Sequence, residues 1–337
     1  MAEERILVIQ LRQLGDILLT TPLLRAIKIE RPKARLTFLS HAMGHLIVEQ
    51  SPFVDEHFSY SDQSTKREEW KLAKTLRERR FDLVFDFMNN PRSAFYTLFS
   101  GGKRRYAFRS ARRPAYTDVI AKPTEPEYIV REKFRLLRAA GFTPTDERLV
   151  LPWNESHTRP VMKLYGTDAA YRNATLRIVL SPTHRRDVRQ WPLDRYARLA
   201  DRMVGEWGAY VQWLHGPGEE GVIDEVMRLC SSATHKAPPT TFREMAALIG
   251  NADLFVGNSN GPSHVAVAGN ICSLQLHGPT SAASWCPQND KHQAVQGAST
   301  MDSVGEGEVW ARLTHMRPVI TAFAAAERAR RPKASWR

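Results

Sequence analysis

The stretch from Ile6 to Pro22, ILVIQLRQLGDILLTTP, constrains the fold more than any other part of the chain. It opens with large aliphatic residues up to Leu11, interrupted by a single Gln and no turn former, which is typical of a parallel strand covered on both faces. The chain then passes through a loop with Gly15 and Asp16 before an apolar run begins a helix. Because ligands bind at the carboxyl ends of strands in open α/β sheets, Asp16 is a candidate for chemistry.

A purely structural role for Asp16 is the alternative. As an N-cap it would accept hydrogen bonds from free backbone N–H groups and oppose the helix dipole. The helix could also start with Thr21 as N-cap and Pro22 at its first position, which would leave Asp16 in an irregular loop. If the helix begins at Asp16 instead, Pro22 removes one hydrogen bond and kinks it.

Predicted strands and helices alternate along the chain, as in βαβ units. In the first half we expect strands at 6–11, 35–39 and 83–87 and helices at 66–79 and 128–140. The pattern dissolves between residues 143 and 174, which are rich in Pro and polar residues, and this stretch indicates a domain boundary. In the second half we expect strands at 177–180, 209–214, 254–256 and 271–276 and helices at 193–207, 219–230, 242–249 and 261–269.

The repeated alternation predicts an α/β protein with two Rossmann-like domains facing each other across a cleft. We expect the first domain at residues 1–160 and the second at 172–305. A helix at about 310–328, broken at Pro318, is expected to pack back on the first domain, and residues 329–337 form a basic tail.

The chain is strongly basic, with 48 Lys and Arg against 36 Asp and Glu and a formal net charge of +12. One basic cluster lies between Lys103 and Arg113 among aromatic residues, and another lies in the tail from Arg328. Such clusters attract polyanions, an anionic membrane surface or a phosphorylated glycolipid. A merely solvated basic face is the alternative for the tail. No helix-turn-helix, RNA-binding or zinc-finger pattern occurs, which argues against nucleic acid as a partner.

Targeting signals and cysteine chemistry are both inconspicuous. No apolar run approaches the roughly 18 residues that cross a bilayer, and the opening MAEER lacks a signal-peptide core, so we expect a cytoplasmic protein. The three cysteines, Cys230, Cys272 and Cys286, have no CxxC spacing and no accompanying His cluster. Buried or idle thiols are therefore expected rather than disulfides or a zinc site.

The first two strand ends of the second half carry residues suited to phosphate and sugar. After 177–180 come the hydroxyl of Thr183 and a group of arginines that includes Arg189, whose forked guanidinium matches phosphate oxygens. After 209–214, Gly216 lets a ligand approach the backbone, and Glu219 is placed to bind ribose hydroxyls. A helix-dipole role for Glu219 is the alternative.

The last two strand ends have the same character. The segment GNSNGPSHVAVAG, which follows 254–256, places a loop before a helix whose free N–H groups form an anion site. His264 lies one turn into that helix, and a structural histidine with satisfied hydrogen bonds is the alternative to a ligand contact. After 271–276 come Gly278 and Thr280. Neither a Walker loop nor a GxGxxG fingerprint occurs, and no DxD-like pair suggests a metal.

These segments resemble the ADP-heptose:lipopolysaccharide heptosyltransferase family over nearly the whole chain. The similarity is carried by ILVIQLRQLGDILLTTPLLRAI, FDLVFDFMNNPRSAFYTLFSGGKRRYAF, the RQWP at 189–192, the HGPGEE turn and VGNSNGPSHVAVAGNICSLQLHGPT. The RxxGDxLLTTP motif is most similar to that of the family branch that adds the third, side-branch heptose. The resemblance implies a GT-B fold and an inverting, metal-independent transfer from ADP-heptose to the inner core.

The resemblance also implies roles for individual residues. Asp16 corresponds to the general base, which removes a proton from the attacking acceptor hydroxyl. Its place at a helix N-terminus is expected to keep it ionised and to weaken its basicity. The expected donor-binding residues are Thr183, Arg189, Gly216, Glu219, Ser259, Asn260, Gly261, Pro262, His264, Gly278 and Thr280. The expected acceptor-binding residues are Arg12, Gly15, Arg104, Arg105 and Arg109.

The implied partners follow from the same resemblance. They are a nucleotide sugar, which serves as substrate with no further cofactor, and a phosphorylated lipopolysaccharide core acceptor. The family acts at the cytoplasmic face of the inner membrane, so a peripheral membrane contact is expected. We expect the stretch from Lys103 to Tyr116 to contact acidic groups of the acceptor.

One position departs from the family. Where the family usually has Asp-Ser/Thr-Gly-Pro-x-His, this chain has Ser259, so the donor contact has lost its charge. The donor then binds more weakly, the donor sugar differs, or Asn260 substitutes. Three other functions stay open: a nucleotide-sugar-binding protein without turnover, a glycosyltransferase for another nucleotide sugar, and a nucleotide-sugar epimerase.

Overall fold

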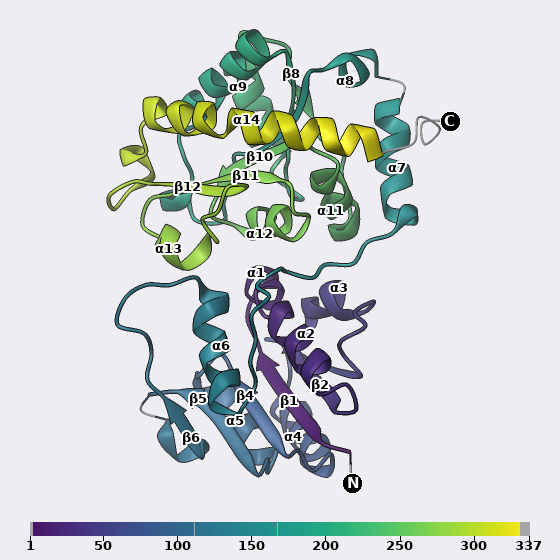
Figure 1. The fold of residues 1–337 in the computed structure, drawn as a ribbon, viewed down its shortest axis with the longest axis vertical. Helices are drawn as coiled ribbons and strands as arrows, with labels where there is room; N and C mark the ends of the chain where they lie inside the picture. The colour runs from purple at the N-terminus through teal and green to yellow at the C-terminus, as the bar shows by residue number, and fades with distance from the viewer. Residues whose placement is uncertain (1–2, 111, 167, 331–337) are drawn as a thin grey trace. The chain divides into compact units, whose positions relative to one another are not determined.

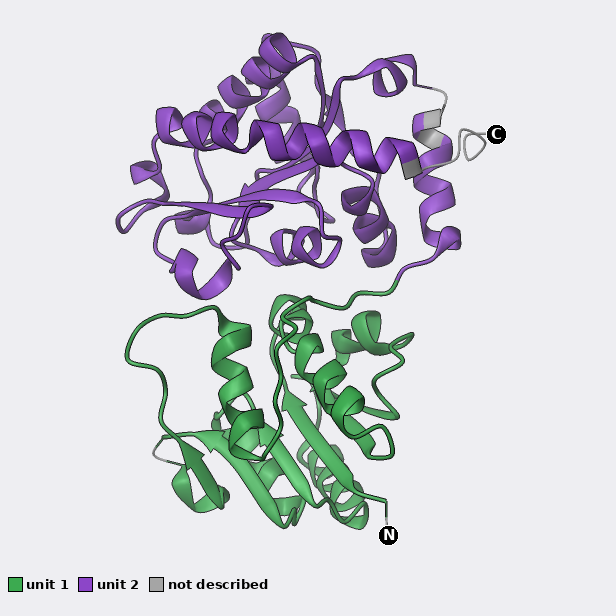
Figure 2. Ribbon diagram, in the orientation of Figure 1, with its two compact units in different colours: residues 1–152 green, residues 153–337 purple. Residues whose placement is uncertain are grey.

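The computed structural model describes residues 3–110, 112–166 and 168–330 (Figure 1). The chain divides into two compact units, residues 1–152 and 153–337 (Figure 2). The division falls inside the stretch 143–174, before the end at residue 160 that the sequence predicted. Each unit contains one six-stranded sheet with helices packed on it, which confirms the α/β class and the two Rossmann-like domains. Residues 331–337 of the expected tail lie outside the described residues.

The sheet of the first unit is entirely parallel, in the order β3-β2-β1-β4-β5-β6. Its strands are β1 (Arg5–Gln10), β2 (Arg35–His41), β3 (Glu56–Tyr60), β4 (Leu83–Asp86), β5 (Arg104–Phe108) and β6 (Asp118–Ile120). Its helices are α1 (Leu14–Leu18), α2 (Thr21–Glu30), α3 (His45–Val48), α4 (Lys66–Glu78), α5 (Pro91–Phe99) and α6 (Ile129–Ala139), with 3-10 turns η1 (Ala42–Gly44) and η2 (Arg113–Ala115).

The centre of this sheet lies at β1 and β4, where the strand order reverses. The two strands pair with Ile9 opposite Asp86. Leu7 and Ile9 pack in the cluster that also holds Ala73 and Leu76 of α4, while α2 and α6 contact each other. The carboxyl ends of β1 and β4 therefore form the switch point at which open α/β sheets bind ligands.

The second unit repeats this arrangement in the order β12-β11-β10-β7-β8-β9. Its strands are β7 (Leu176–Ser181), β8 (Ala209–Trp213), β9 (His235–Lys236), β10 (Leu254–Asn258), β11 (Cys272–His277) and β12 (His292–Gln296). Its helices are α7 (Glu155–Gly166), α8 (Ala169–Asn173), α9 (Leu193–Trp207), α10 (Glu220–Leu229), α11 (Phe242–Gly250), α12 (Gly261–Ala268), α13 (Ala282–Trp285) and α14 (Glu306–Arg330), with 3-10 turns η3 (Asp187–Arg189) and η4 (Met301–Ser303). Its switch point lies between β7 and β10.

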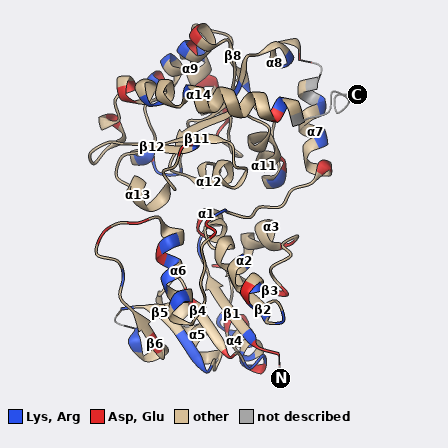
Figure 3. Ribbon diagram, in the orientation of Figure 1, with Lys and Arg blue, Asp and Glu red and all other residues tan. Residues whose placement is uncertain are grey.

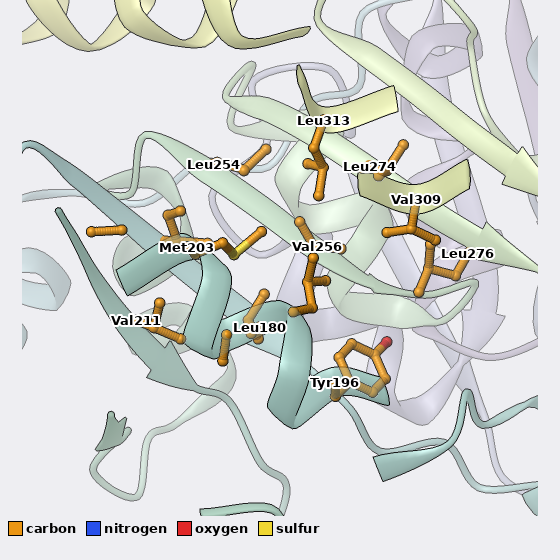
Figure 4. Packing of buried hydrophobic residues seen from close by; sticks show 14 of the residues in the cluster. Leu180, Tyr196, Met203, Val211, Leu254, Val256, Leu274, Leu276, Val309 and Leu313 are labelled. Carbon is orange, nitrogen blue, oxygen red and sulfur yellow. The ribbon is translucent and has the colours of Figure 1, made fainter. Parts of the chain in front are cut away.

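The core of the second unit joins the sheet to α9 and α14 (Figure 4). Val309 and Leu313 of α14 are fully buried with Leu274 and Leu276 of β11. This helix therefore packs on its own unit, whereas the sequence suggested a return to the first domain. It also runs unbroken through Pro318, where a break was expected.

Several strands and one helix were not predicted from the sequence, and each omission has a physical reason. The strands β3, β9 and β12 are short or only partly buried, so they lack an apolar run. Helix α7 lies in the stretch that was interpreted as a domain boundary. Its internal Pro160 argued against a helix there, so the sequence pattern did not predict it. The three cysteines are free thiols, and Cys272 and Cys286 are buried, as the sequence predicted.

Candidate functional site

The first site begins where β1 ends, at the short helix α1. Its N-cap is Gln13, so Asp16 lies in the first turn and is not itself the cap. The chain then turns and α2 begins at Thr21, with Thr20 as N-cap and Pro22 in its first turn. The prediction of a single kinked helix that begins at Asp16 was therefore wrong. The alternative prediction, with Thr21 as the N-cap, was wrong as well. The break keeps Pro22 where its missing N–H is harmless.

Asp16 is half-buried, and burial raises the pKa of its carboxyl group. The charges of Lys133 and Arg12 oppose that shift. This overturns the expectation of weakened basicity, because a carboxylate removed from water holds a proton more readily. Among the described residues no side chain or amide donates a hydrogen bond to the Asp16 carboxylate. Its oxygens are therefore available to accept a proton.

Lys133 of α6 is the residue at this site that the sequence interpretation missed. Its side chain is buried, and its Nζ donates to Thr20 Oγ1 at 2.8 Å, to the Asp16 carbonyl at 3.2 Å and to the Leu19 carbonyl at 3.4 Å. Burial lowers the pKa of Lys133 to about 8. The ammonium group thus ties α6 to the turn that carries Asp16.

A signal for Lys133 was present in the sequence. It follows Val130 by three residues and precedes Leu137 by four, so it occupies the apolar face of α6, and both neighbours are buried. A lysine on the core face of an amphipathic helix needs buried partners. That requirement, applied to this segment, would have singled it out.

The turn after β4 forms the other side of the switch point. Asp86 is fully buried and accepts hydrogen bonds from the Met88 and Asn89 amides, at 2.9 and 3.0 Å, and from the Tyr116 hydroxyl at 2.7 Å. Burial raises the pKa of this carboxyl group, and the hydrogen bonds oppose the shift. Because these oxygens are already engaged, we interpret Asp86 as an organiser of the turn.

The basic stretch after β4 divides between the two ends of the sheet (Figure 3). Arg104 and Arg105 lie at the amino end of β5, because Arg104 is paired with Leu83, the first residue of β4. Arg104 forms an ion pair with Asp118 at 2.6 Å, and Arg105 donates to the Ala115 and Gly102 carbonyls. This placement favours a structural role for both rather than the expected acceptor contact.

Other members of the stretch lie at the carboxyl end of the sheet. Arg109 directly follows β5 and is exposed. Arg112 donates to the Asn89 carbonyl at 3.0 Å, which joins this segment to the β4 turn. Arg12 is exposed beside α1, and Gly15 lies within α1. The first unit therefore brings Arg12, Gly15 and Arg109, but not Arg104 and Arg105, to the carboxyl ends of its strands.

In the second unit, Glu219 joins the loops after β7 and β8. Its Oε2 accepts from Thr183 Oγ1 and from the Gly216 amide, both at 2.7 Å. The half-exposed side chain leaves Oε1 without a hydrogen bond among the described residues. Three expected donor residues therefore share one small network. A carboxylate held this way can accept from a ribose hydroxyl.

The loop between β10 and α12 is held by asparagines. Asn260 is the N-cap of α12, accepts from the Ser263 amide and donates from Nδ2 to the Thr183 carbonyl at 3.1 Å. Asn258, to which no individual role was assigned from the sequence, is fully buried. Its Oδ1 accepts a hydrogen bond from the Trp191 amide at 3.0 Å. The N-terminus of α12 is thereby fixed beside the end of β7.

Arg189 lies in η3, between the end of β7 and a buried anchor. The anchor is Trp191, which is fully buried and donates from Nε1 to the Val304 carbonyl at 2.9 Å. Burial lowers the pKa of His184 in the same loop, and the charge of Arg189 adds to that shift. Arg189 therefore lies close to the β7 end, as the expected donor contact requires.

Two of the three glycines assigned to the donor, Gly261 and Gly278, differ in what they contact. A Cβ on Gly278 would come within 2.6 Å of the Thr300 backbone, so packing alone explains this glycine. A Cβ on Gly261, at the start of α12 before Pro262, would meet nothing within 4 Å. The fold does not require glycine there, which favours a ligand that approaches the backbone.

The remaining expected donor residues lie near these loops. Ser259 is half-buried, and its amide donates to the Leu276 carbonyl at 3.2 Å. Thr280 pairs with His277 Nδ1 at 3.2 Å. His264 is buried, and its ring centroid lies 6.1 Å from that of Trp285 in α13.

Over residues 3–110, 112–166 and 168–330, no three His, Cys, Asp or Glu side chains gather in an arrangement that could hold a metal ion. Within the same ranges no helix combines the length and apolar character needed to span a membrane.

Comparison with known proteins gives a consistent result. The family model of glycosyltransferase family 9 (heptosyltransferase) matches residues 69–308. The chain is 24% identical over 295 residues to lipopolysaccharide heptosyltransferase 3 of Escherichia coli (strain K12), covering 82% of this chain and 83% of that protein.

Solved structures show the same fold. A glycosyl transferase family 9 structure from Veillonella parvula superposes with a TM-score of 0.81 at 18% identity, covering 93% of this chain and 97% of that one. The E. coli heptosyltransferase WaaC with ADP superposes with a TM-score of 0.73 at 15% identity, covering 93% of this chain and 99% of that one.

Proposed function

Because the chain belongs to glycosyltransferase family 9 (heptosyltransferase), we propose that it transfers heptose from ADP-heptose to the inner core of lipopolysaccharide. The observation that carries the proposal is Asp16, whose carboxylate lies at the switch point and accepts no hydrogen bond from the described residues. Burial raises the pKa of this carboxyl group, and the buried Lys133 donates a hydrogen bond to the Asp16 backbone carbonyl. Such a group is suited to remove a proton from a hydroxyl near neutral pH.

We assign the acceptor to the first unit and the donor to the second. In the proposed step, Asp16 takes the proton of an acceptor hydroxyl while that oxygen bonds to the anomeric carbon. The bond between that carbon and the ADP phosphate oxygen breaks, so the sugar configuration inverts and ADP leaves. No cofactor beyond the ADP-sugar is needed in this step.

The residues of the second unit suit a nucleoside diphosphate. Arg189 and the backbone N–H groups at the start of α12 can stabilise the charge that develops on the leaving phosphate. Glu219 can accept from ribose hydroxyls through its Oε1. The solved relative WaaC contains ADP, which supports ADP as the nucleotide for this chain.

We propose an acidic core acceptor on the basis of Arg12, Arg109 and Arg112, which are basic groups near the strand ends of the first unit. The name of the relative lipopolysaccharide heptosyltransferase 3 supports lipopolysaccharide as the acceptor. Such an acceptor is linked to lipid, so we also propose a cytoplasmic protein in peripheral contact with the inner membrane.

The test is ADP release from ADP-heptose, measured with and without a heptose-deficient core acceptor. We expect acceptor-dependent release that falls by about 10² to 10⁴ in Asp16→Asn, the usual contribution of a general base. Glu78→Gln, which neutralises an exposed carboxylate at the far end of α4, is the matched control and should keep full activity. Full-rate transfer by Asp16→Asn would refute the assignment. No transfer by the intact protein would favour a binding protein without turnover.

Ser259, in place of the family's aspartate, supports a second candidate: a glycosyltransferase for another nucleotide sugar. A thermal-shift comparison of ADP, UDP, GDP and their sugars distinguishes the two, because a ligand that binds only the native state raises its stability. We expect ADP compounds to stabilise most. A modified free sugar released without acceptor would point instead to an epimerase.

A further inference from the structure

The outer surface of α4 and α5 exposes apolar side chains that no part of the proposed reaction uses. Trp70 of α4 is 53% exposed and Leu98 of α5 is 46% exposed. The indole packs edge-on against Phe95 and Phe99 of α5, with ring centroids 5.3 and 4.9 Å apart. These contacts hold Trp70 in place while leaving half of it in water.

Basic residues surround this tryptophan on its helix. Lys66 and Arg67 precede it by four and three residues, and Lys74 and Arg77 follow it by four and seven. At 100° per residue, all four lie within about 60° of Trp70 around the helix axis. All four are exposed, and Arg67, Lys74 and Arg77 form no ion pair within the described part of the chain.

Two of the three acidic residues of α4 do not offset this charge, and the third, Glu78, lies about two turns beyond Trp70 and about 80° from it around the helix axis. Glu68 is held at the N-terminus by a capping box with Thr65 and points about 160° from Trp70. Glu69 is buried and pairs with Arg92 at 3.1 Å and Lys66 at 3.0 Å. The surface around the indole is therefore a positive rim around an apolar centre.

We propose that this surface, which we call the α4–α5 face (Arg67, Trp70, Lys74, Arg77 and Leu98), docks on an anionic phospholipid bilayer. The indole and Leu98 enter the headgroup layer, and the basic side chains meet lipid phosphates. Two apolar side chains within a basic rim suit a lipid surface better than a stable protein interface, which buries more than about 1,000 Å².

The position of this face is compatible with catalysis. Trp70 lies on the outer side of α4, whose inner residues Ala73 and Leu76 pack on one face of the sheet. Asp16 lies at the carboxyl end of that sheet and is tied to α6, which contacts α2. Docking through α4 and α5 would leave the strand ends uncovered. The inference rests on the membrane contact in the proposed function and deepens it, because it assigns that contact to one surface; it does not depend on the donor sugar.

The test is co-sedimentation of the full chain with vesicles of phosphatidylcholine alone or with 30% phosphatidylglycerol, a composition chosen on the order of natural anionic content. We expect binding only to the anionic vesicles. The variant Arg67→Gln/Lys74→Gln/Arg77→Gln should bind about 100-fold more weakly, from about fivefold per basic residue. Lys163→Gln/Arg172→Gln/Arg228→Gln removes the same charge from exposed positions of the second unit and should bind as the wild type does.

A second measurement reports insertion directly. Brominated lipids quench tryptophans that enter the bilayer, and we expect Trp70→Phe to keep vesicle binding while losing part of this quenching. Trp70→Ser/Leu98→Ser should weaken binding, whereas Ile29→Ser, which alters another exposed apolar residue of the first unit, should not. Transfer to a water-soluble acceptor should be unchanged in all these variants.

Three results would overturn the proposal. They are wild-type protein that does not bind anionic vesicles, α4–α5 variants that bind as the wild type does, and equal losses in the matched controls. If Trp70→Ser converted a dimer to a monomer without changing vesicle binding, the face would belong to a second copy of the chain. Lost activity on the soluble acceptor with unchanged vesicle binding would count against the proposed reaction rather than against the docking face.

Discussion

Lys133 donates a hydrogen bond of 3.2 Å to the backbone carbonyl of Asp16. The same carbonyl accepts from the Thr20 hydroxyl at 2.8 Å, so two donors from separate elements fix the backbone of the proposed base. The Lys133 charge also lowers the pKa of the Asp16 carboxyl group, against the larger effect of burial, which raises it. Lys133 is therefore interpreted as a positioning residue that tunes Asp16 without touching substrate.

Lys133→Met should move the acid limb of the kcat/KM profile to higher pH. Removing the positive charge leaves burial less opposed, so the pKa of Asp16 rises and the carboxylate is protonated at pH values where the wild type is ionised. Profiles measured from pH 4 to 9 check this.

Lys122→Met is the control for that profile, because Lys122 is exposed and pairs with Glu132. It should leave the acid limb in place. A Lys133→Met enzyme with reduced stability but an unchanged profile would show that the lysine has only a structural role.

Gly261→Ala and Gly278→Ala should separate ligand approach from packing. The methyl group at Gly261 meets open space, so stability should stay within about 0.5 kcal/mol while affinity for ADP falls, since the added group blocks the backbone. At Gly278 the methyl group collides with the Thr300 backbone, so stability should fall by about 1 to 3 kcal/mol. Denaturant unfolding and calorimetric titration with ADP measure both. Equal ADP affinity in Gly261→Ala and the wild type would remove Gly261 from the site.

Glu219→Ala should weaken ADP binding by about 10- to 100-fold, because a charged hydrogen bond is worth about 1.5 to 3 kcal/mol. The change also releases the Thr183 hydroxyl and the Gly216 amide, which both donate to Oε2. Titration with ADP and with 2′-deoxy-ADP tests the ribose contact, since the variant should discriminate less between them. Glu225→Ala, an exposed carboxylate on α10, is the control. Unchanged discrimination would assign Glu219 to loop structure alone.

Ser259→Asp should restore the charge that the family carries at this position. If the donor is ADP-heptose, affinity for the sugar nucleotide should rise by about tenfold, the difference between charged and neutral hydrogen bonds, while affinity for ADP alone stays constant. Competition binding with both ligands measures this. A variant whose ADP-heptose affinity falls or stays the same would indicate that the natural donor sugar differs.

The buried strands and the loops that follow them could be predicted from local patterns. Buried strands such as β1 and β10 are runs of apolar residues that can only lie inside a covered sheet, and the residues after them must fall at one edge. That reasoning brought Asp16, Glu219 and Asn260 to strand ends, where the structure has them. The short strands β3 and β9 lacked this signal because nearly all of their residues are only partly buried or exposed.

What the sequence determined by itself is the set of buried periodic segments and the polar residues that interrupt them, because hydrophobic burial depends mainly on local spacing. The tertiary structure alone decided which end of β5 holds Arg104, that Gly278 is required by the Thr300 backbone, and that Lys133 lies beneath Asp16. The last pair is separated by 117 residues. Desolvation and hydrogen bonding depend on such distant neighbours, so the pKa of Asp16 belongs to the folded unit and not to its local sequence.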